Sequence, residues 1–370
     1  LDGKLISDGA KNMEWSSASK YSSFNSYKGL TYFEHYKKIL GWMDGKNELP
    51  PPIEASLDPI SACNNKCYYC NSQRYLRDDP PGLKRWGQDY LEDILIDLAK
   101  WGVKAWCWGG GGESTLNIRL PGMTKFGTDL GMECGIITNG VNLSDELIDE
   151  LMLARWIGVS VDSFFPDVYK KVRGTDDCLK VMQNIKKMAE RRTKTDICVK
   201  VLVLPETIDG MVRTCQIARD LGVQDFHVRP VDLERKDFKT RKQLALDMSK
   251  IQKAFEGCHA LETDTFHVYT VGHKFTDTLQ NKPNNFRCLA SSLLAQICTD
   301  KRIYVCVDHR LEERFCIGDA HEGIKGWGSK EHRNLLECID PATECSRCTF
   351  REYNLQMEAI TEDTMCRNFP

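Results

Sequence analysis

Apolar and polar positions follow one repeated pattern along the middle of the chain: an amphipathic helix, then a glycine, then a short apolar run. Leu91, Ile94 and Leu98 fall on one helical face, and Gly102 follows them at a position where glycine commonly ends a helix. The apolar run at 103–108 that comes next predicts a strand.

The pattern predicts about six strands separated by helices. They are expected at residues 53–59, 103–108, 132–138, 157–162, 199–204 and 223–230. Strands that alternate with helices form parallel βα units, either in a barrel or in a doubly wound sheet. The expected fold class is therefore α/β.

The segments on either side of this repeat have a different character. A helix is predicted over residues 32–42, and the three prolines at 50–52 form a linker into the first strand. After a further helix at about 241–257, residues 286–370 are cysteine-rich with short elements. We expect a helical extension at 1–52, a βα domain at 53–257 and a small domain at 258–370.

Composition narrows the functional classes. The 370 residues carry a net charge of −3 with both signs interspersed, which favours neither a nucleic-acid nor a membrane partner. No apolar run approaches the roughly 20 residues of a membrane-spanning helix, and no signal-peptide pattern opens the chain. Seventeen cysteines in so long a chain indicate a reducing compartment, expected to be cytoplasmic, where thiolates serve as metal ligands.

Three cysteines stand close together after the first predicted strand. Cys63, Cys67 and Cys70 have the spacing C-x₃-C-x₂-C, and no fourth cysteine accompanies them. A structural zinc site takes four ligands, usually in two separated pairs. Three thiolates instead suit a [4Fe–4S] cluster with one iron open to an outside ligand, because a fully protein-held cluster uses four cysteines. In βα barrels this end of the strands carries the active site.

With Tyr69 before its last cysteine, this motif resembles the cluster motif of radical S-adenosylmethionine (SAM) enzymes. The resemblance covers about residues 53–230 and implies a partial (β/α)6 TIM-like barrel. It implies that SAM chelates the open iron and is cleaved to a 5′-deoxyadenosyl radical, which abstracts hydrogen from a substrate. Cluster and SAM carry the chemistry while the protein orients and shields them. An electron donor such as flavodoxin or ferredoxin is also implied.

Further segments match the family in the expected order. Gly111, Gly112 and Glu113 correspond to its G-G-E motif, whose backbone groups pair with the methionyl part of SAM. Glu113 either holds the SAM ammonium group or caps the next helix. The resemblance implies further SAM contacts from Tyr69, Thr138, Asn139, Ser160, Asp162 and Arg173, the last of these against the SAM carboxylate.

Two polar residues follow on the sixth predicted strand. His227 and Arg229 are expected near the barrel mouth, as candidate catalytic residues that contact substrate. An ordinary polar pair at the end of a strand explains them equally well.

The tail offers a second set of thiols in Cys288, Cys306, Cys345 and Cys348. On metal chemistry alone, four thiolates suit tetrahedral zinc or a second iron–sulfur cluster. Joined to a radical SAM barrel, the arrangement resembles the auxiliary-cluster extensions called SPASM and twitch. No closely spaced cysteine pair follows Cys348, which favours the twitch type with one auxiliary [4Fe–4S] cluster held by these four residues.

Two features of the tail are not explained by the four proposed ligands. Lys301 stands where SPASM tails usually place a glycine. Cys316, Cys338 and Cys366 are left over, each as a buried thiol, an alternative ligand or a hydrogen-atom donor. Cys316 is the candidate donor because it lies within the cluster-binding segment.

The expected function is therefore enzymatic: hydrogen abstraction from a small polar substrate, sugar-like or a natural product. Hydrogen abstraction would lead to dehydrogenation or epimerisation, and the auxiliary cluster would transfer electrons. Epimerisation would need a thiol such as Cys316 to return a hydrogen atom to the substrate. A maturase of ribosomal peptides is the alternative enzyme, although about 50 residues before the barrel are too few for the usual peptide-recognition domain. An iron–sulfur or zinc protein for electron transfer or recognition is the non-enzyme alternative, and it leaves the ordered motifs unexplained.

Overall fold

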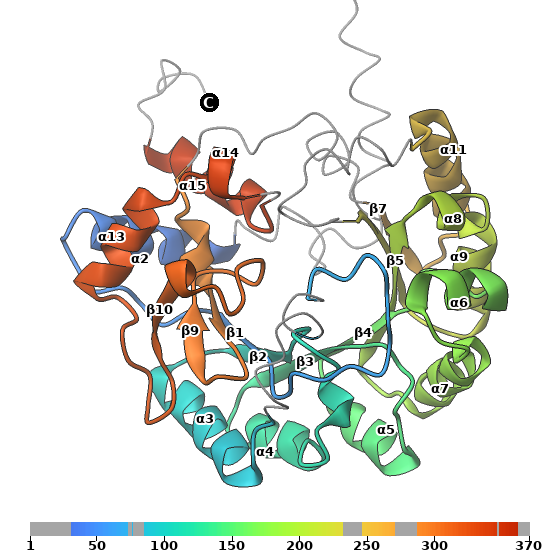
Figure 1. The fold of residues 1–370 in the computed structure, drawn as a ribbon, viewed down its shortest axis with the longest axis horizontal. Helices are drawn as coiled ribbons and strands as arrows, with labels where there is room; N and C mark the ends of the chain where they lie inside the picture. The colour runs from blue at the N-terminus through green and yellow to red at the C-terminus, as the bar shows by residue number, and fades with distance from the viewer. Residues whose placement is uncertain are drawn as a thin grey trace, which may run out of the picture.

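A ten-stranded sheet runs through the molecule and carries helices on its outer side (Figure 1). The computed structural model describes residues 31–72, 76, 85–231, 246–270, 287–345 and 348–361. The strand order is β10-β9-β8-β1-β2-β3-β4-β5-β6-β7. The strands are β1 (Glu54–Leu57), β2 (Ala105–Trp108), β3 (Glu133–Thr138), β4 (Trp156–Ser160), β5 (Asp196–Val203), β6 (Asp225–Pro230), β7 (His267–Thr270), β8 (Leu294–Ile297), β9 (Arg302–Tyr304) and β10 (Cys316–Asp319).

Helices follow most of these strands. They are α2 (Phe33–Met43), α3 (Gln88–Trp101), α4 (Met123–Asp129), α5 (Asp145–Leu151), α6 (Pro166–Arg173), α7 (Cys178–Arg191), α8 (Pro205–Ile208), α9 (Met211–Asp220), α11 (Met248–His259), α13 (Lys330–Cys338), α14 (Pro341–Glu344) and α15 (Arg351–Thr361). Within the described ranges, none of them is long and apolar enough to cross a membrane.

The predicted partial barrel is confirmed. Strands β1 to β7 pair with their neighbours in parallel, and each of the six predicted strands corresponds to one of β1 to β6. Strand β7 was not predicted, because its four residues carry no extended alternating pattern. The parallel sheet therefore continues past residue 257, where the sequence pattern placed the end of the βα domain.

Local signals explain why the helices end where they do. In α3 the apolar face formed by Leu91, Ile94 and Leu98 is fully buried against the sheet, as predicted. Gly102 caps this helix with φ at 101°, in the left-handed region that glycine adopts without steric cost. The turn at Gly102 then directs the chain into β2.

Alternation along the strands separates the core from the barrel interior. Trp106 and Trp108 of β2 are buried, and a Cβ at Gly127 of α4 would collide with the Trp106 ring. Cys107 lies between them in sequence and faces the other side, toward the interior. The two tryptophans therefore pack mainly in the helix-covered core.

The cysteine-rich region extends the barrel sheet. Strand β8 pairs with β1 in parallel, and β9 and β10 continue the sheet in antiparallel pairing. The turn between β8 and β9 contains Lys301, whose φ of 64° lies in the left-handed region. The sequence resemblance places a glycine at this position, and the backbone keeps the conformation that glycine prefers.

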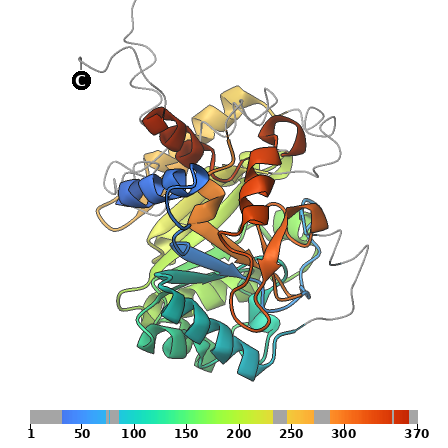
Figure 2. The ribbon, with the colours of Figure 1, turned by 90° about the vertical axis from the view of Figure 1, so that its left-hand side faces the viewer.

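The segment before the barrel packs against the C-terminal region. In Figures 1 and 2 the blue helix α2 lies beside the red helices at the other end of the chain. The Tyr36 hydroxyl donates to Gln356 Oε1 at 3.2 Å, and Trp42 Nε1 donates to the carbonyl of Gly328 at 3.1 Å. These contacts attach α2 to the region around α13 and α15.

Candidate functional site

The three clustered cysteines lie on the loop after the C-terminal end of β1. Cys67 is buried, while Cys63 and Cys70 are more accessible. Burial raises the pKa of Cys63 to about 12, and negative charge on Glu113, Cys67 and Cys70 adds to this effect. The three thiols are therefore close enough to interact electrostatically, which fits a shared cluster.

The loop is held by the C-terminal end of α6. The backbone N–H of Lys66 donates to the Arg173 carbonyl at 2.9 Å, and Arg173 Nη1 donates to Cys67 Sγ at 3.4 Å. Gly174 ends the helix with φ at +74°, and a Cβ there would lie 2.7 Å from the Lys66 carbonyl. The guanidinium placed beside a cluster thiol is suited to stabilise its thiolate form.

Asp162 connects several of the predicted cofactor contacts. Its carboxylate accepts hydrogen bonds from the Tyr69 hydroxyl and, at 2.9 Å, from the Leu202 backbone N–H. Arg173 forms an ion pair with it, with Nε 3.0 Å from Oδ2. Asp162 has a φ of 66°, a conformation that non-glycine residues adopt only when their contacts hold them, as at functional sites.

The glycine-rich segment after β2 approaches the cysteine loop closely. The Gly111 N–H donates to Asp58 Oδ1 at 3.1 Å, and a Cβ on Gly111 would lie 2.6 Å from Asp58 Oδ2. A Cβ on Gly112 would lie 2.7 Å from the Ile60 carbonyl. Side chains at these positions would push the two loops apart, so the glycines permit the approach.

Replacing Gly112 with alanine is expected to destabilise the protein by about 1–3 kcal/mol, because the new methyl group overlaps backbone atoms that cannot rotate away. Gly110→Ala is the matched control, since a Cβ there meets nothing within 4 Å. Urea unfolding of both variants measures the difference. Equal midpoints for the two variants would contradict the close packing inferred for Gly112.

Glu113 is buried and fully engaged in the structure. Its carboxylate caps the short helix Ser114–Leu116, and it accepts hydrogen bonds from Thr138 Oγ1 at 2.7 Å and from the Asn139 N–H at 2.6 Å. Burial raises the pKa of Glu113, and these hydrogen bonds oppose that rise. Of the two predicted roles, capping is the one seen here, and contact with a SAM ammonium group stays a prediction.

A cavity of about 220 Å³ at the C-terminal ends of β3 to β6 is lined by four of the nine predicted cofactor contacts and by the candidate catalytic residue Arg229. The predicted residues on its walls are Tyr69, Ser160, Asp162, Arg173 and Arg229. Lys200 of β5 lines it as well and was not predicted. The feature that could have identified Lys200 is its place as a single lysine within the apolar strand 196–203. His227 is buried on the same strand as Arg229, two residues earlier, and is not among the lining residues.

The structure brings the four predicted tail thiols together. Burial raises the pKa of Cys306, and neighbouring negative charge on Asp308, Cys288 and Cys348 raises it further. Cys345 acts in the same way on the pKa of Cys348. Since Cys288 precedes β8 and Cys306 follows β9, the hairpin places them near each other.

Polar groups surround these thiols. The Asp308 N–H donates to Cys306 Sγ at 3.4 Å, and Asn354 Nδ2 donates to Cys348 Sγ at 3.7 Å. His309 Nε2 lies 3.5 Å from Cys345 Sγ. Donors of this kind lower the cost of thiolate charge and tune a bound cluster.

The thiols do not converge as the ligands of one ion would. Ligands of a single zinc ion all lie about 2.0–2.3 Å from it. In the part of the chain that the structure describes, no three His, Cys, Asp or Glu side chains are arranged in that way.

The remaining thiols lie elsewhere. Cys316 opens the edge strand β10 opposite Tyr304, and its pKa, raised by burial, is lowered by Arg302. Strands β9, β8, β1 and β2 separate it from the cavity at β3 to β6, so the structure does not bring Cys316 to the predicted substrate site. Proximity in sequence to Cys306 misled, because the chain turns outward between them. Cys338 is exposed, and Cys366 lies outside the described residues.

An ion pair joins the tail to the barrel interior. Arg310 Nε lies 2.8 Å from Asp58 Oδ2, and Gln296 Nε2 donates to the same oxygen at 3.1 Å. Asp58 is only 2% exposed, and it also receives the Gly111 N–H. The loop after Cys306 is thereby connected to the glycine segment. Sequence reasoning missed Asp58 and Arg310, which are 252 residues apart.

Comparison with known proteins supports the same assignment. The sequence model of the Radical SAM superfamily matches residues 57–218. A tungsten-containing aldehyde ferredoxin oxidoreductase cofactor-modifying protein of Pyrococcus furiosus is 29% identical over 178 residues, which cover 45% of this chain and 48% of that protein. The chain thus matches about half of that relative's length. A probable GTP 3′,8-cyclase of Sulfolobus acidocaldarius is 23% identical, over 74% of this chain and 86% of that protein.

Solved structures of other enzymes share this fold. SuiB of Streptococcus suis, in a crystal structure with its precursor peptide SuiA, superposes with a TM-score of 0.63 at 13% identity, over 90% of this chain and 79% of that chain. The enzyme anSMEcpe, with bound AdoMet and a peptide, gives a TM-score of 0.60 at 15% identity, over 82% of this chain and 88% of that chain. The predicted α/β fold, a partial TIM-like barrel followed by a SPASM-like cysteine-rich region, is therefore confirmed. The motifs, the barrel and the match over residues 57–218 together identify a radical SAM domain in this chain.

Proposed function

We propose that the enzyme abstracts hydrogen from a small polar substrate, sugar-like or a natural product, and completes a dehydrogenation. The observation that carries this proposal is the composition of the 220 Å³ cavity, in which Lys200, Arg229 and Ser160 line a small polar space beside Tyr69 and Asp162. A pocket of this size and polarity suits a compact substrate with hydroxyl or anionic groups.

The three thiols of the first loop fit a [4Fe–4S] cluster with one open iron. When bound, that cluster and SAM supply the hydrogen-abstracting radical, and an auxiliary cluster supplies an acceptor for the electron that an oxidised substrate must lose. Electrons for the first cluster would come from a donor such as flavodoxin or ferredoxin. Tyr69, Asp162 and Arg173 form the wall that orients SAM, and the buried Glu113 fixes the ends of β2 and β3 beside it.

The substrate contacts belong to the strands that line the cavity. Arg229 and Lys200 offer charged donors to substrate oxygens, and His227, buried two residues before Arg229 on β6, is a proposed acid–base partner. Dehydrogenation is favoured over epimerisation because Cys316, the predicted hydrogen donor, lies on the far edge strand.

The tail thiols are the proposed ligands of one auxiliary [4Fe–4S] cluster. The double variant Cys288→Ala/Cys306→Ala is expected to lose about four of about eight irons per chain. SAM cleavage under dithionite should remain, because the first cluster is untouched, while product formation should fall. Cys338→Ala, which changes an exposed thiol, is the matched control and should keep its iron. An unchanged iron content in the double variant would refute the assignment.

A peptide substrate is the second candidate. The crystal structures of SuiB and anSMEcpe with peptides show that this fold accommodates peptide substrates in those enzymes. An assay for 5′-deoxyadenosine with small polyols and with peptides as additives discriminates between the two: stimulation by peptides alone would replace the small-substrate proposal.

A further inference from the structure

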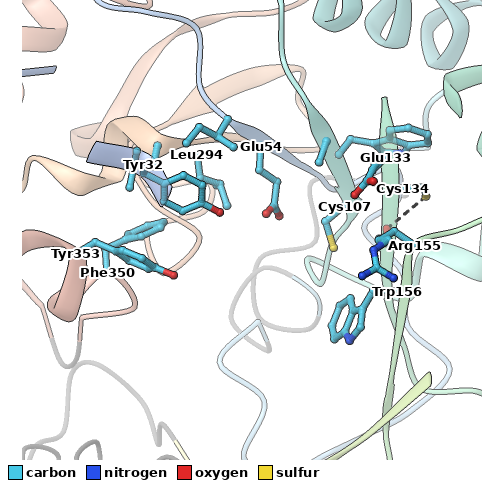
Figure 3. Close-up of a pocket in the computed structure, with 15 residues that line it drawn as sticks. Tyr32, Glu54, Cys107, Glu133, Cys134, Arg155, Trp156, Leu294, Phe350 and Tyr353 are labelled. Atoms are coloured by element: carbon cyan, nitrogen blue, oxygen red, sulfur yellow. Dashed lines mark hydrogen bonds between the residues drawn. The ribbon is translucent and has the colours of Figure 1, made fainter. Parts of the chain in front are cut away.

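A second cavity, of about 290 Å³, lies at the end of the barrel opposite the cysteine loop (Figure 3). Its walls include the first residues of several parallel strands: Glu54 of β1, Ala105 of β2, Glu133 of β3 and Trp156 of β4. Parallel strands begin at one edge of a sheet and end at the other, so this cavity and the one beside Tyr69 occupy opposite ends of the barrel interior. None of the cluster or cofactor motifs contributes to it.

Aromatic rings form one side of this cavity. Tyr32, Phe350 and Tyr353 come from the two ends of the chain, and the ring centroids of Tyr32 and Tyr353 are 6.2 Å apart. Figure 3 shows the carboxylate of Glu54 projecting between this aromatic side and Cys107. A carboxylate framed by aromatic rings is the arrangement that binds organic ammonium groups.

The charges around the cavity favour a cation. Glu54 and Glu133 both line it, while Arg155, the cation on its wall, forms an ion pair with Asp196 at 3.0 Å. Burial raises the pKa of the Cys107 thiol, and the negative charge of Glu54 raises it further.

The two cavities share strands, and this sets a distance between them. Gly135 and Trp156 line the lower cavity, and Ile137 and Ser160 line the upper one on the same strands. Separations of two and four residues correspond to about 7 and 13 Å at roughly 3.3 Å per residue. Lys200 reaches from the upper cavity to the Trp156 ring, with Nζ 5.1 Å from its centroid.

We propose that the lower cavity binds an organic ammonium group of the substrate, on strands that also line the upper cavity. This inference rests on the proposed function and adds a substrate class to it: an amine-bearing polar molecule. Arg173 is paired with Asp162, so Lys200 and Arg229 give the upper cavity its net positive charge, whereas Glu54 and Glu133 make the lower one anionic. This polarity orients the substrate, with its ammonium group away from the radical chemistry.

The test uses the anaerobically reconstituted holoenzyme and isothermal titration calorimetry. Butylammonium chloride is expected to bind at one site, and the neutral analogue butan-1-ol is not. Glu54→Gln, which keeps shape and removes charge, should weaken butylammonium binding about tenfold or more. Glu146→Gln, on the exposed face of α5, is the matched control and should bind as the wild type does.

Location is read out separately by mass spectrometry. Bound butylammonium should slow alkylation of Cys107 by iodoacetamide, because that thiol faces the cavity. Equal affinity of wild type and Glu54→Gln, equal binding of butan-1-ol, or binding without protection of Cys107 would each overturn the proposal.

Displacement of bound butylammonium by other molecules tests whether the ammonium group belongs to the substrate or to a separate small amine. If it belongs to a sugar-like substrate, 2-amino-2-deoxyglucose should displace butylammonium and glucose should not. Displacement by neither would indicate a separate small amine and overturn the substrate assignment. SAM cleavage under dithionite, measured without any amine, tests the proposed function alone. Its absence together with intact amine binding would refute the enzyme reaction and leave the cavity assignment standing.

Discussion

Replacing Cys63, Cys67 and Cys70 together with alanine is expected to abolish 5′-deoxyadenosine formation and to lower the iron content from about eight to about four per chain. The three side chains lie on one loop and are the predicted ligands of a cluster with one iron open for SAM. Iron and sulfide analysis after anaerobic reconstitution, with chromatography of the SAM products, provides the measurement.

The complementary result comes from the tail. In the Cys288→Ala/Cys306→Ala double variant the remaining iron should belong to the first loop and should still support SAM cleavage. A loss of all iron in the triple variant, starting from about four in the wild type, would mean that the tail holds no iron–sulfur cluster. The electron acceptor assigned to it would then have to be abandoned.

The second large effect concerns the ion pair between the tail and the barrel. Asp58→Ala should destabilise the folded protein by about 3–5 kcal/mol, because it leaves the largely buried Arg310 without its carboxylate. It should also weaken SAM binding, since the Gly111 N–H loses its acceptor. Urea unfolding and equilibrium binding of SAM measure the two effects.

A double-mutant cycle separates the pair from its surroundings. Asp58→Ala/Arg310→Met removes both charges and should recover part of the lost stability, because no uncompensated charge is left inside. Asp129→Ala breaks an exposed ion pair with Lys125 and should leave the unfolding midpoint unchanged. Strictly additive effects of the two interior substitutions would show that Asp58 and Arg310 act independently.

Much of the site could be predicted because short-range spacing encodes it. A cluster needs thiols on one flexible loop, so Cys63, Cys67 and Cys70 stand within eight residues. Where one backbone segment contacts another, as at Gly112, only glycine fits, and the glycine-rich run is visible in the sequence. The alternation of helices and parallel strands followed from the helical and strand periods, which depend only on neighbours along the chain.

Contacts between distant segments could not be predicted in this way. Lys200 lines the upper cavity because β5 lies beside β4 with Lys200 opposite Ser160, a register that the sequence of either strand alone does not specify. Cys316 was expected near the chemistry from its place in the chain, and the antiparallel hairpin of β9 and β10 places it at the sheet edge instead.

The sequence by itself therefore determined the fold class and the resemblance to radical SAM enzymes, and it predicted the first set of cluster ligands, since each depends on residue type and local spacing. Tertiary structure alone decided that Asp58 meets Arg310, that Glu113 bonds to the end of β3, and that Glu54 faces the aromatic rings from both ends of the chain. Those contacts are set by how the sheet curves and how the tail joins β1, and no local pattern of side chains records that geometry.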